Sequence, residues 1–259
     1  MVPWILDTAT NIHSVAHPTD GFVEKKLNLQ GISLTLSCYT NPNNMNIISA
    51  SLLLKKDIDH IVFNKNKAIL YKNKEGKHVP VGLFLYDNES RLFIISKEKI
   101  PHTSRYIAIN REMEYNMHIM MWRRVINLDE KLLFKMDSGS SFNVTTNLDI
   151  VHDFQRQNPV PVRTFWNDME DIGRGRVVLI LYENPEIRRS IPVRVYKSKT
   201  DAIVNVISIG WLTTEGKMDI YMNLEGMSVS KNGELLFRAT SDMDNKYTLL
   251  GRANPPGNK

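Results

Sequence analysis

Two short stretches of this chain decide its fold. The first, WILDTATNIH at Trp4–His13, runs from an apolar strand into a turn built from an acid, hydroxyl residues and a small residue. The second, LFKMDSGSSFN at Leu133–Asn143, repeats this layout and has Asp137 where the first has Asp7. A single Asp-Thr-Ala or Asp-Ser-Gly is typical of an ordinary turn. Two of them, each after an apolar strand, indicate a duplicated site.

The similarity continues after the two aspartates. Residues from Asn46 and from Asn205 align at a constant offset of 159. Identical pairs at this offset include Asn46/Asn205, Ile48/Ile207, Ser49/Ser208, Leu53/Leu212, Asn64/Asn223, Lys72/Lys231 and Asn73/Asn232. We therefore expect two divergent copies of one unit. The aspartate and the asparagine lie 39 residues apart in the first copy and 68 apart in the second.

Short apolar stretches, separated by turns of Asn, Gly, Pro and Lys, dominate the chain. This pattern predicts an all-β protein with few short helices. The best helix candidates are residues 49–56, 147–157 and 208–216. We interpret GRGR at 173–176 as a strand turn, because it lacks the other residues of a phosphate-binding glycine loop. The predicted organisation is a first unit at 1–96, a connector at 97–131, a second unit at 132–251 and a tail at 252–259.

A pair of equivalent aspartates suits one kind of chemistry. Like charges about 3 Å apart cannot both ionise cheaply, so two facing carboxylates share one proton. One carboxylate then acts as a base toward water, and the other donates a proton to a scissile carbonyl group. On this reasoning Asp7 and Asp137 are the predicted catalytic pair.

The residues after each aspartate have supporting roles in such a site. A hydroxyl at the next position, Thr8 or Ser138, can hydrogen-bond across to the other copy and hold the two loops together. A small residue after it, Ala9 or Gly139, lets its backbone N–H approach the carboxylate. Gly139 fits this role fully. Ala9 fits less well, because its Cβ restricts the backbone where glycine is free.

These motifs resemble a known family. WILDTATNIH resembles the WILDSGASxH opening of the protease in copia-type retrotransposon polyproteins, and His13 falls six residues after Asp7 as the family's histidine does. NPNNMNIISASLL and SKTDAIVNVISIGWLTTEG resemble the segment of that protease that contains N-L-I-S-V. GRGRVVLILYENPEIRRSIPVRVY and VSKNGELLFRATSDMDNKYTL resemble its later strands and its closing segment. The resemblance covers most of both copies.

The resemblance implies an acid-protease fold of the retropepsin type. Proteases of this type are normally homodimers with one aspartate per subunit. Here the two subunits would be two lobes of one chain, related by a pseudo-two-fold axis, so a monomer would act as an internal pseudo-dimer. The implied activity is that of an aspartic endopeptidase, in which the Asp7/Asp137 pair activates water to cleave an extended peptide or protein substrate.

The resemblance also implies a flap, a hairpin that closes over the bound peptide. The first copy is short where this hairpin should lie, between Ser14 and Gly31. The second copy has room for it in VRTFWNDMEDIGRG. The flap and substrate residues expected there are Trp166, Asn167, Asp168 and Gly173. The shortened first flap and Ala9 leave an alternative open, a catalytically inactive pseudoprotease that serves as a peptide-binding or regulatory scaffold.

Composition narrows the remaining functions. The single Cys38 allows no internal disulfide, no apolar run reaches the length of a membrane span, and no secretory leader is apparent, so we expect a cytoplasmic or nuclear protein without a membrane partner. The histidines are scattered, so neither a metal nor another cofactor is expected. His13 is interpreted as a local hydrogen-bonding residue. The net charge of +5 adds a third hypothesis, nucleic-acid binding, which rests on charge alone.

Overall fold

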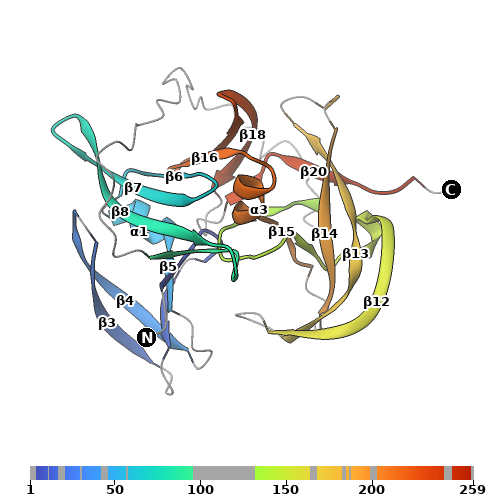
Figure 1. Ribbon diagram of the computed structural model, residues 1–259, viewed down its shortest axis with the longest axis horizontal. Helices are drawn as coiled ribbons and strands as arrows, with labels where there is room; N and C mark the ends of the chain where they lie inside the picture. The colour runs from blue at the N-terminus through green and yellow to red at the C-terminus, as the bar shows by residue number, and fades with distance from the viewer. Residues whose placement is uncertain are drawn as a thin grey trace.

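The computed structural model describes residues 4–10, 12–16, 21–29, 31–41, 46–56, 58–95, 132–163, 168–182, 185–186, 188–198, 203–241 and 247–257. Among these described residues the fold is mostly β, with 65% strand and 9% helix, arranged as one large mixed sheet with two short α-helices. Figure 1 shows this arrangement. The predicted connector at 97–131 lies outside the described residues, as do Trp166 and Asn167.

The strands fall into two consecutive sets, which we call the first half (residues 4–95) and the second half (residues 132–257). The elements of the first half are β1 (Trp4–Asp7), β2 (His13–Ala16), β3 (Phe22–Asn28), β4 (Ser33–Asn41), β5 (Asn46–Ser49), α1 (Ala50–Lys56), β6 (His60–Phe63), β7 (Lys67–Lys74), β8 (Lys77–Asp87) and β9 (Leu92–Ile95). Those of the second half are β10 (Lys135–Asp137), β11 (Val144–Thr145), η2 (Leu148–Ile150), β12 (His152–Arg163), β13 (Asp168–Leu181), β14 (Arg188–Ser198), β15 (Asn205–Ser208), α3 (Ile209–Thr214), β16 (Asp219–Met222), β17 (Gly226–Lys231), β18 (Glu234–Ser241), β19 (Tyr247–Leu249) and β20 (Gly251–Asn254).

The two halves repeat the same strand pairings. β1 runs parallel to β5 with Asp7 opposite Ser49, and β10 runs parallel to β15 with Asp137 opposite Ser208. β2 lies between β4 and β5, just as β11 lies between β14 and β15. The offset of 159 residues seen in the sequence therefore joins positions that have the same place in the sheet.

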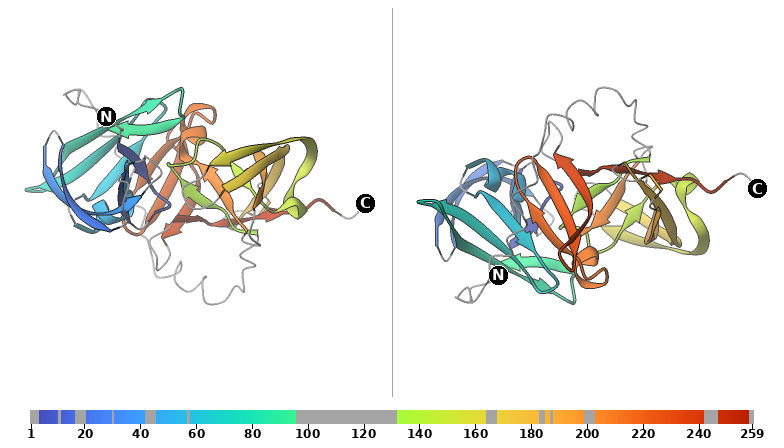
Figure 2. Two further views of the ribbon diagram at one scale, coloured as in Figure 1. Left: turned by 90° about the horizontal axis from the view of Figure 1, so that it is seen from below. Right: turned by 90° about the horizontal axis from the view of Figure 1, so that it is seen from above.

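β6 and β16 join the halves into one continuous sheet. They are antiparallel, with Val62 opposite Tyr221, and each continues into a hairpin of its own half. In both views of Figure 2 the strands of the first half lie at one end of the molecule and β12–β14 at the other, with β16–β18 between them. One hydrophobic cluster runs through both halves and includes Leu6 and Met136, the fully buried residues before the two aspartates.

The turns at Asn64 and Asn223 are equivalent in detail. Each asparagine side chain accepts hydrogen bonds from the backbone N–H groups two and three residues further on. Beyond them the constant offset fails. Asn73 is still paired in the sheet, whereas Asn232 forms the next turn, because β7 is two residues longer than β17 and β8 is three residues longer than β18. Lys231 is therefore the last paired residue before its turn, as Lys74 is in the first half, and the predicted equivalences Lys72/Lys231 and Asn73/Asn232 are wrong.

Two local predictions are wrong because sheet pairing overrides local pattern. Residues 147–157 form only the short 3₁₀ turn η2 before β12 begins, and Asp153 has a φ of 52°, which no α-helix contains. GRGR at 173–176 lies within β13 and not in a turn. Position 173 has room only for glycine, because a Cβ there would lie 2.3 Å from the carbonyl oxygen of Gln155 on the paired strand. The other two helix candidates contain α1 and α3.

The clearest difference between the halves is the β12–β13 hairpin. In the second half it follows η2 and precedes β14. In the first half only residues 17–21 separate β2 from β3, so no such hairpin has room to form there. Among the described residues, no helix is long and apolar enough to cross a lipid bilayer.

Candidate active site

The loops that follow β1 and β10 bring Asp7 and Asp137 together. Their side chains share a hydrogen bond, although the residues are 130 positions apart in the chain. Gly139 lies beside both groups. A Cβ built on it would be 2.8 Å from Oδ2 of Asp7 and 3.2 Å from Oδ1 of Asp137. The two carboxyl groups therefore face each other across the junction of the halves.

Backbone N–H groups hold each carboxylate in place. Oδ1 of Asp7 accepts from the N–H of Ala9 at 2.7 Å and from that of Thr10 at 3.2 Å. Oδ1 of Asp137 accepts from the N–H of Gly139 at 2.6 Å. Ala9 thus makes the same contact as Gly139. Neither has a positive φ, so the expected conformational handicap of Ala9 is wrong.

Thr8 and Ser138 link the halves directly beneath the carboxylates. The Thr8 hydroxyl donates to the carbonyl oxygen of Met136 at 2.9 Å and accepts from the N–H of Ser138 at 3.0 Å. The Ser138 hydroxyl donates to the carbonyl oxygen of Leu6 at 2.7 Å. Both side chains are completely buried. Because buried polar groups are costly to leave unpaired, these bonds fix the relative position of the two loops.

The surroundings make both carboxyl groups hard to ionise. Burial raises the pKa of Asp7, and the backbone N–H bonds and its hydrogen bond with Asp137 partly offset that effect. Burial raises the pKa of Asp137 well above the usual value of 3.8, and the nearby Asp7 carboxylate raises it further. The pair therefore favours one proton shared between the two carboxyl groups.

A second layer of hydrogen bonds repeats behind each loop. Ser49 donates through its hydroxyl to the Thr10 carbonyl at 2.7 Å, and Ser208 donates likewise to the Ser140 carbonyl at 2.6 Å. These serines stand at the starts of α1 and α3, and they tie each aspartate loop to a helix. Sequence comparison found the Ser49/Ser208 pair but not this role, because the role depends on contacts made only in the folded chain.

His13 and Asn143 occupy equivalent positions and make the same bond. Nδ1 of His13 accepts from the N–H of Ser49 at 3.1 Å, and Oδ1 of Asn143 accepts from the N–H of Ser208 at 2.9 Å. Burial, with a smaller effect of the Lys56 charge, lowers the pKa of His13 to about 4, so the ring is neutral at physiological pH. The structure gives His13 the hydrogen-bonding position inferred from the sequence.

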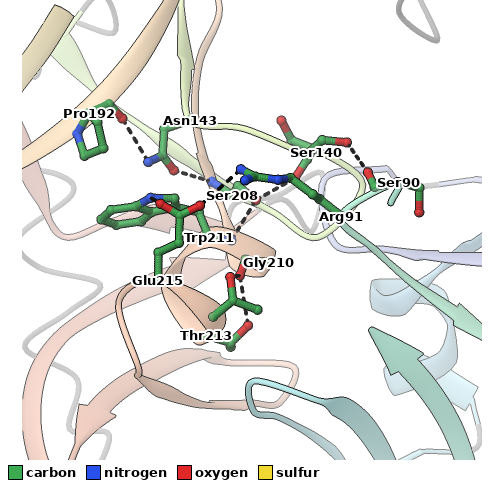
Figure 3. A network of polar contacts seen from close by, with 12 residues as sticks. Ser90, Arg91, Ser140, Asn143, Pro192, Ser208, Gly210, Trp211, Thr213 and Glu215 are labelled. Atoms are coloured by element: carbon green, nitrogen blue, oxygen red, sulfur yellow. Dashed lines mark hydrogen bonds and ion pairs between the residues drawn. The ribbon is translucent and has the colours of Figure 1, made fainter. Parts of the chain in front are cut away.

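One further contact between the halves has no signal in the sequence. The turn before β9 reaches the second half, where the Ser90 carbonyl accepts from the Ser141 hydroxyl at 2.6 Å. The next residue, Arg91, forms an ion pair with Glu215 at 3.1 Å, and its guanidinium lies 5.0 Å from the centre of the Phe142 ring. Figure 3 shows Arg91 beside Glu215 and Trp211. We call Ser90, Arg91, Ser141 and Glu215 the clasp.

The expected flap residues are only partly described. Asp168 begins β13, opposite Arg163. Gly173 lies five residues further along β13, away from the end of the hairpin. Trp166 and Asn167 lie outside the described residues. Among the described residues, no three His, Cys, Asp or Glu side chains come together as a metal site would require.

Comparison with models of known protein families found no match for this chain, and a search of curated proteins found no relative.

Proposed function

We propose that the protein is an aspartic endopeptidase of the retropepsin type, with the two halves as lobes related by a pseudo-two-fold axis. The observation that carries this proposal is the hydrogen-bonded pair of Asp7 and Asp137, contributed by equivalent loops of two repeated halves. The Thr8 and Ser138 bonds support it, since they hold the loops at the separation that a shared proton requires.

A single shared proton gives the two carboxyl groups distinct roles. The ionised group takes a proton from water, whose oxygen attacks the carbonyl carbon of the scissile peptide bond. The protonated group gives its proton to the carbonyl oxygen, and a tetrahedral intermediate forms. When that intermediate collapses, the C–N bond breaks, the leaving nitrogen takes a proton from one carboxyl group, and a hydroxyl group of the intermediate returns a proton to the other, so the pair again holds one proton. The products are a carboxylic acid and an amine.

The β12–β13 hairpin would cover the substrate from one side. Hairpins of this kind exclude water and can hold an extended peptide through main-chain hydrogen bonds. Within the described part of the chain only the second half has such a hairpin, so the two ends of a bound peptide would meet different surroundings.

Digestion of a peptide library tests the proposal. The intact protein should cut peptides over a pH range that begins below neutral, where one carboxyl group is protonated, and Asp137→Asn should lose at least about 100-fold in rate. The matched control is Asp219→Asn on β16, another carboxyl group whose pKa burial raises but which lies outside the pair. Its rate should stay near that of the wild type.

The contrary outcomes are equally clear. If wild type cuts nothing across the pH range, or if Asp137→Asn and wild type cut equally, the protease proposal is wrong. The absent hairpin of the first half favours one second candidate, a pseudoprotease that binds peptides without cleaving them. Saturable peptide binding by an uncleaving wild type, equal in Asp137→Asn, would establish that alternative.

A further inference from the structure

Arginines gather on the outer face of the second-half sheet, in which β13 pairs with both β14 and β20. Figure 1 shows β13 and β14 side by side. Alternate residues of β13 and β14, among them Val177, Leu179 and Val193, point into the core. The residues between them point outward. The outward arginines are Arg174, Arg176, Arg188, Arg194 and Arg252, which we call the arginine face.

Strand register places these arginines in rows. Arg174 lies opposite Arg194 across β13 and β14. At the other end, Ile180 lies between Arg188 on one side and Arg252 on the other. The two rows are six residues apart along β13, or about 20 Å at the rise of an extended strand. The face is thus too long for a single phosphate group and suits a polymer with repeated charges.

The first half provides an internal comparison for this surface. Ser14 and Val144 are equivalent, and their sheet partners are Tyr39 and Arg194 respectively. Starting from the equivalent residues Tyr39 and Arg194, the strand register assigns each outward position of β3 and β4 an equivalent position on β13 or β14. The matched pairs are Phe22/Arg174, Glu24/Arg176, Lys26/Val178, Asn28/Ile180, Ser33/Arg188, Thr35/Ser190, Ser37/Pro192 and Tyr39/Arg194. One acid and one base make the first face neutral, whereas four arginines occupy the second.

Acidic neighbours neutralise only part of the arginine face. Asp153 accepts from Nε of Arg176 at 3.0 Å, and Asp171 pairs with Arg194 at 3.1 Å. Glu186 is exposed in the turn before β14. Within the arginine face, the exposed arginines for which no acidic partner occurs among the described residues are Arg174, Arg188 and Arg252.

We propose that the arginine face binds the phosphate backbone of a nucleic-acid duplex. Guanidinium groups match phosphate geometry with paired hydrogen bonds. The face has no exposed aromatic side chain among its described residues on which unpaired bases would stack, whereas Phe22, at the matched first-half position, is 75% exposed. Among the described residues of β13, β14 and β20 there is also no exposed large apolar side chain, which the centre of a protein interface would need. Binding is therefore to backbone charge, independent of base sequence.

Fluorescence anisotropy of a labelled duplex with the intact wild-type chain tests this proposal. Affinity should fall steeply between about 50 and 200 mM salt. The variant Arg174→Gln/Arg188→Gln/Arg252→Gln should weaken binding about tenfold at low salt. It should also flatten the slope of log K against log salt by about three, one for each lost phosphate contact.

The matched control removes the same charge elsewhere. Lys25→Gln/Lys26→Gln/Lys55→Gln takes three positive charges from exposed positions of the first half and should leave affinity and salt slope unchanged. Equal weakening by the control would show that net charge, and not this face, drives binding. Absence of binding by wild type, or equal competition by poly-glutamate at matched charge, would also overturn the proposal. Thermal unfolding of each variant shows that the fold is intact, and the result does not depend on peptidase activity.

Discussion

The two halves keep the same skeleton and differ in what they attach to it. Thr8 and Ser138 bond across the junction in both directions, and Ser49 and Ser208 tie each aspartate loop to a helix. These bonds fix where the carboxyl groups lie. The differences fall around that skeleton, in the small residue beside the pair, the acceptor behind each loop, the hairpin and the outer sheet face. The two carboxyl groups are thus held by symmetric bonds, whereas their surroundings differ between the halves.

We expect the largest effect from changing Gly139, the small residue beside the carboxyl pair. In Gly139→Ala the new Cβ would lie 2.8 Å from Oδ2 of Asp7, so the carboxyl pair must move apart. A shift of about 1 Å in a reacting group can cost about 100-fold in rate, and we expect at least that loss of peptidase activity. Ala9→Gly is the reciprocal change and should keep activity while costing about 0.5–1 kcal/mol of stability through added chain freedom. Equal loss in both variants would show that the loops are interchangeable.

The next largest effect concerns stability and comes from the side chain that accepts a hydrogen bond behind each aspartate loop, His13 in the first half and Asn143 in the second. The folded chain holds His13 neutral, with a pKa of about 4 against 6.5 for an ordinary histidine. The unfolded chain therefore binds more protons between these values, and stability is complete above pH 6.5 and lost as the pH falls toward 4. The loss from this residue is about 3 kcal/mol.

His13→Asn installs the residue that the second half uses at this position, and Asn143→His makes the opposite exchange. Asparagine still accepts from Ser49, so His13→Asn should flatten the decline of stability in acid. Burial also lowers the pKa of His60 to about 4, so the loss of stability in acid that His60 causes should remain in this variant. Urea unfolding at neutral pH and at pH 4 measures the difference. An equal decline in wild type and His13→Asn would contradict the assignment.

The crossed hydroxyl bonds come third in size. Thr8→Val keeps the volume but leaves the Met136 carbonyl and the Ser138 N–H without their partner, so we expect a loss of about 2 kcal/mol in the free energy of unfolding. Ser138→Ala removes one donor to the Leu6 carbonyl and should cost about 1 kcal/mol. Thr8→Ser retains both bonds and serves as the control. A larger loss from Ser138→Ala than from Thr8→Val would reverse the roles inferred for the two hydroxyls.

Much of this site is predictable because duplication acts as an internal alignment. Asp7 and Asp137 are found by matching two stretches of one chain, and the hydroxyl after each follows from the same match. Asn64 and Asn223 were matched likewise and form the same turn. Predictions of secondary structure from local sequence patterns were less accurate. The helix predicted at 147–157 is wrong because residues from His152 onward extend and pair with β13, a tertiary contact that the local pattern does not encode.

Other parts of the site have no signal in a single sequence. His13 and Asn143 differ in chemistry, and only their shared acceptor role toward the next strand makes them equivalent. Arg91 and Glu215 lie far apart in the chain and have no matching pair at the offset that joins the two copies. Such contacts arise from how the halves dock, which strand patterns do not specify. The arginine face likewise emerges only when register shows which residues share a side of the sheet.

The clasp should give the smallest effect on stability. The side chains of Arg91 and Glu215 are 38% and 51% exposed, and an ion pair this open to solvent contributes less than about 1 kcal/mol. Arg91→Ala should therefore leave the free energy of unfolding almost unchanged. Arg91 nevertheless has a φ of 61°, a conformation that non-glycine residues rarely adopt, and its carbonyl oxygen packs against Gly210 at the start of α3.

Arg91→Gly separates these two contributions, because glycine adopts that φ without strain but has no side chain to pair with Glu215. If backbone docking matters more than the ion pair, Arg91→Gly should be at least as stable as Arg91→Ala. Gly210→Ala, whose Cβ would lie 2.9 Å from the Arg91 carbonyl oxygen and from the Tyr86 ring, should destabilise the chain more than either. Urea unfolding of the three variants ranks them. A loss from Arg91→Ala and Arg91→Gly alike that exceeds the loss from Gly210→Ala would show that the ion pair, and not the close backbone approach, holds this junction.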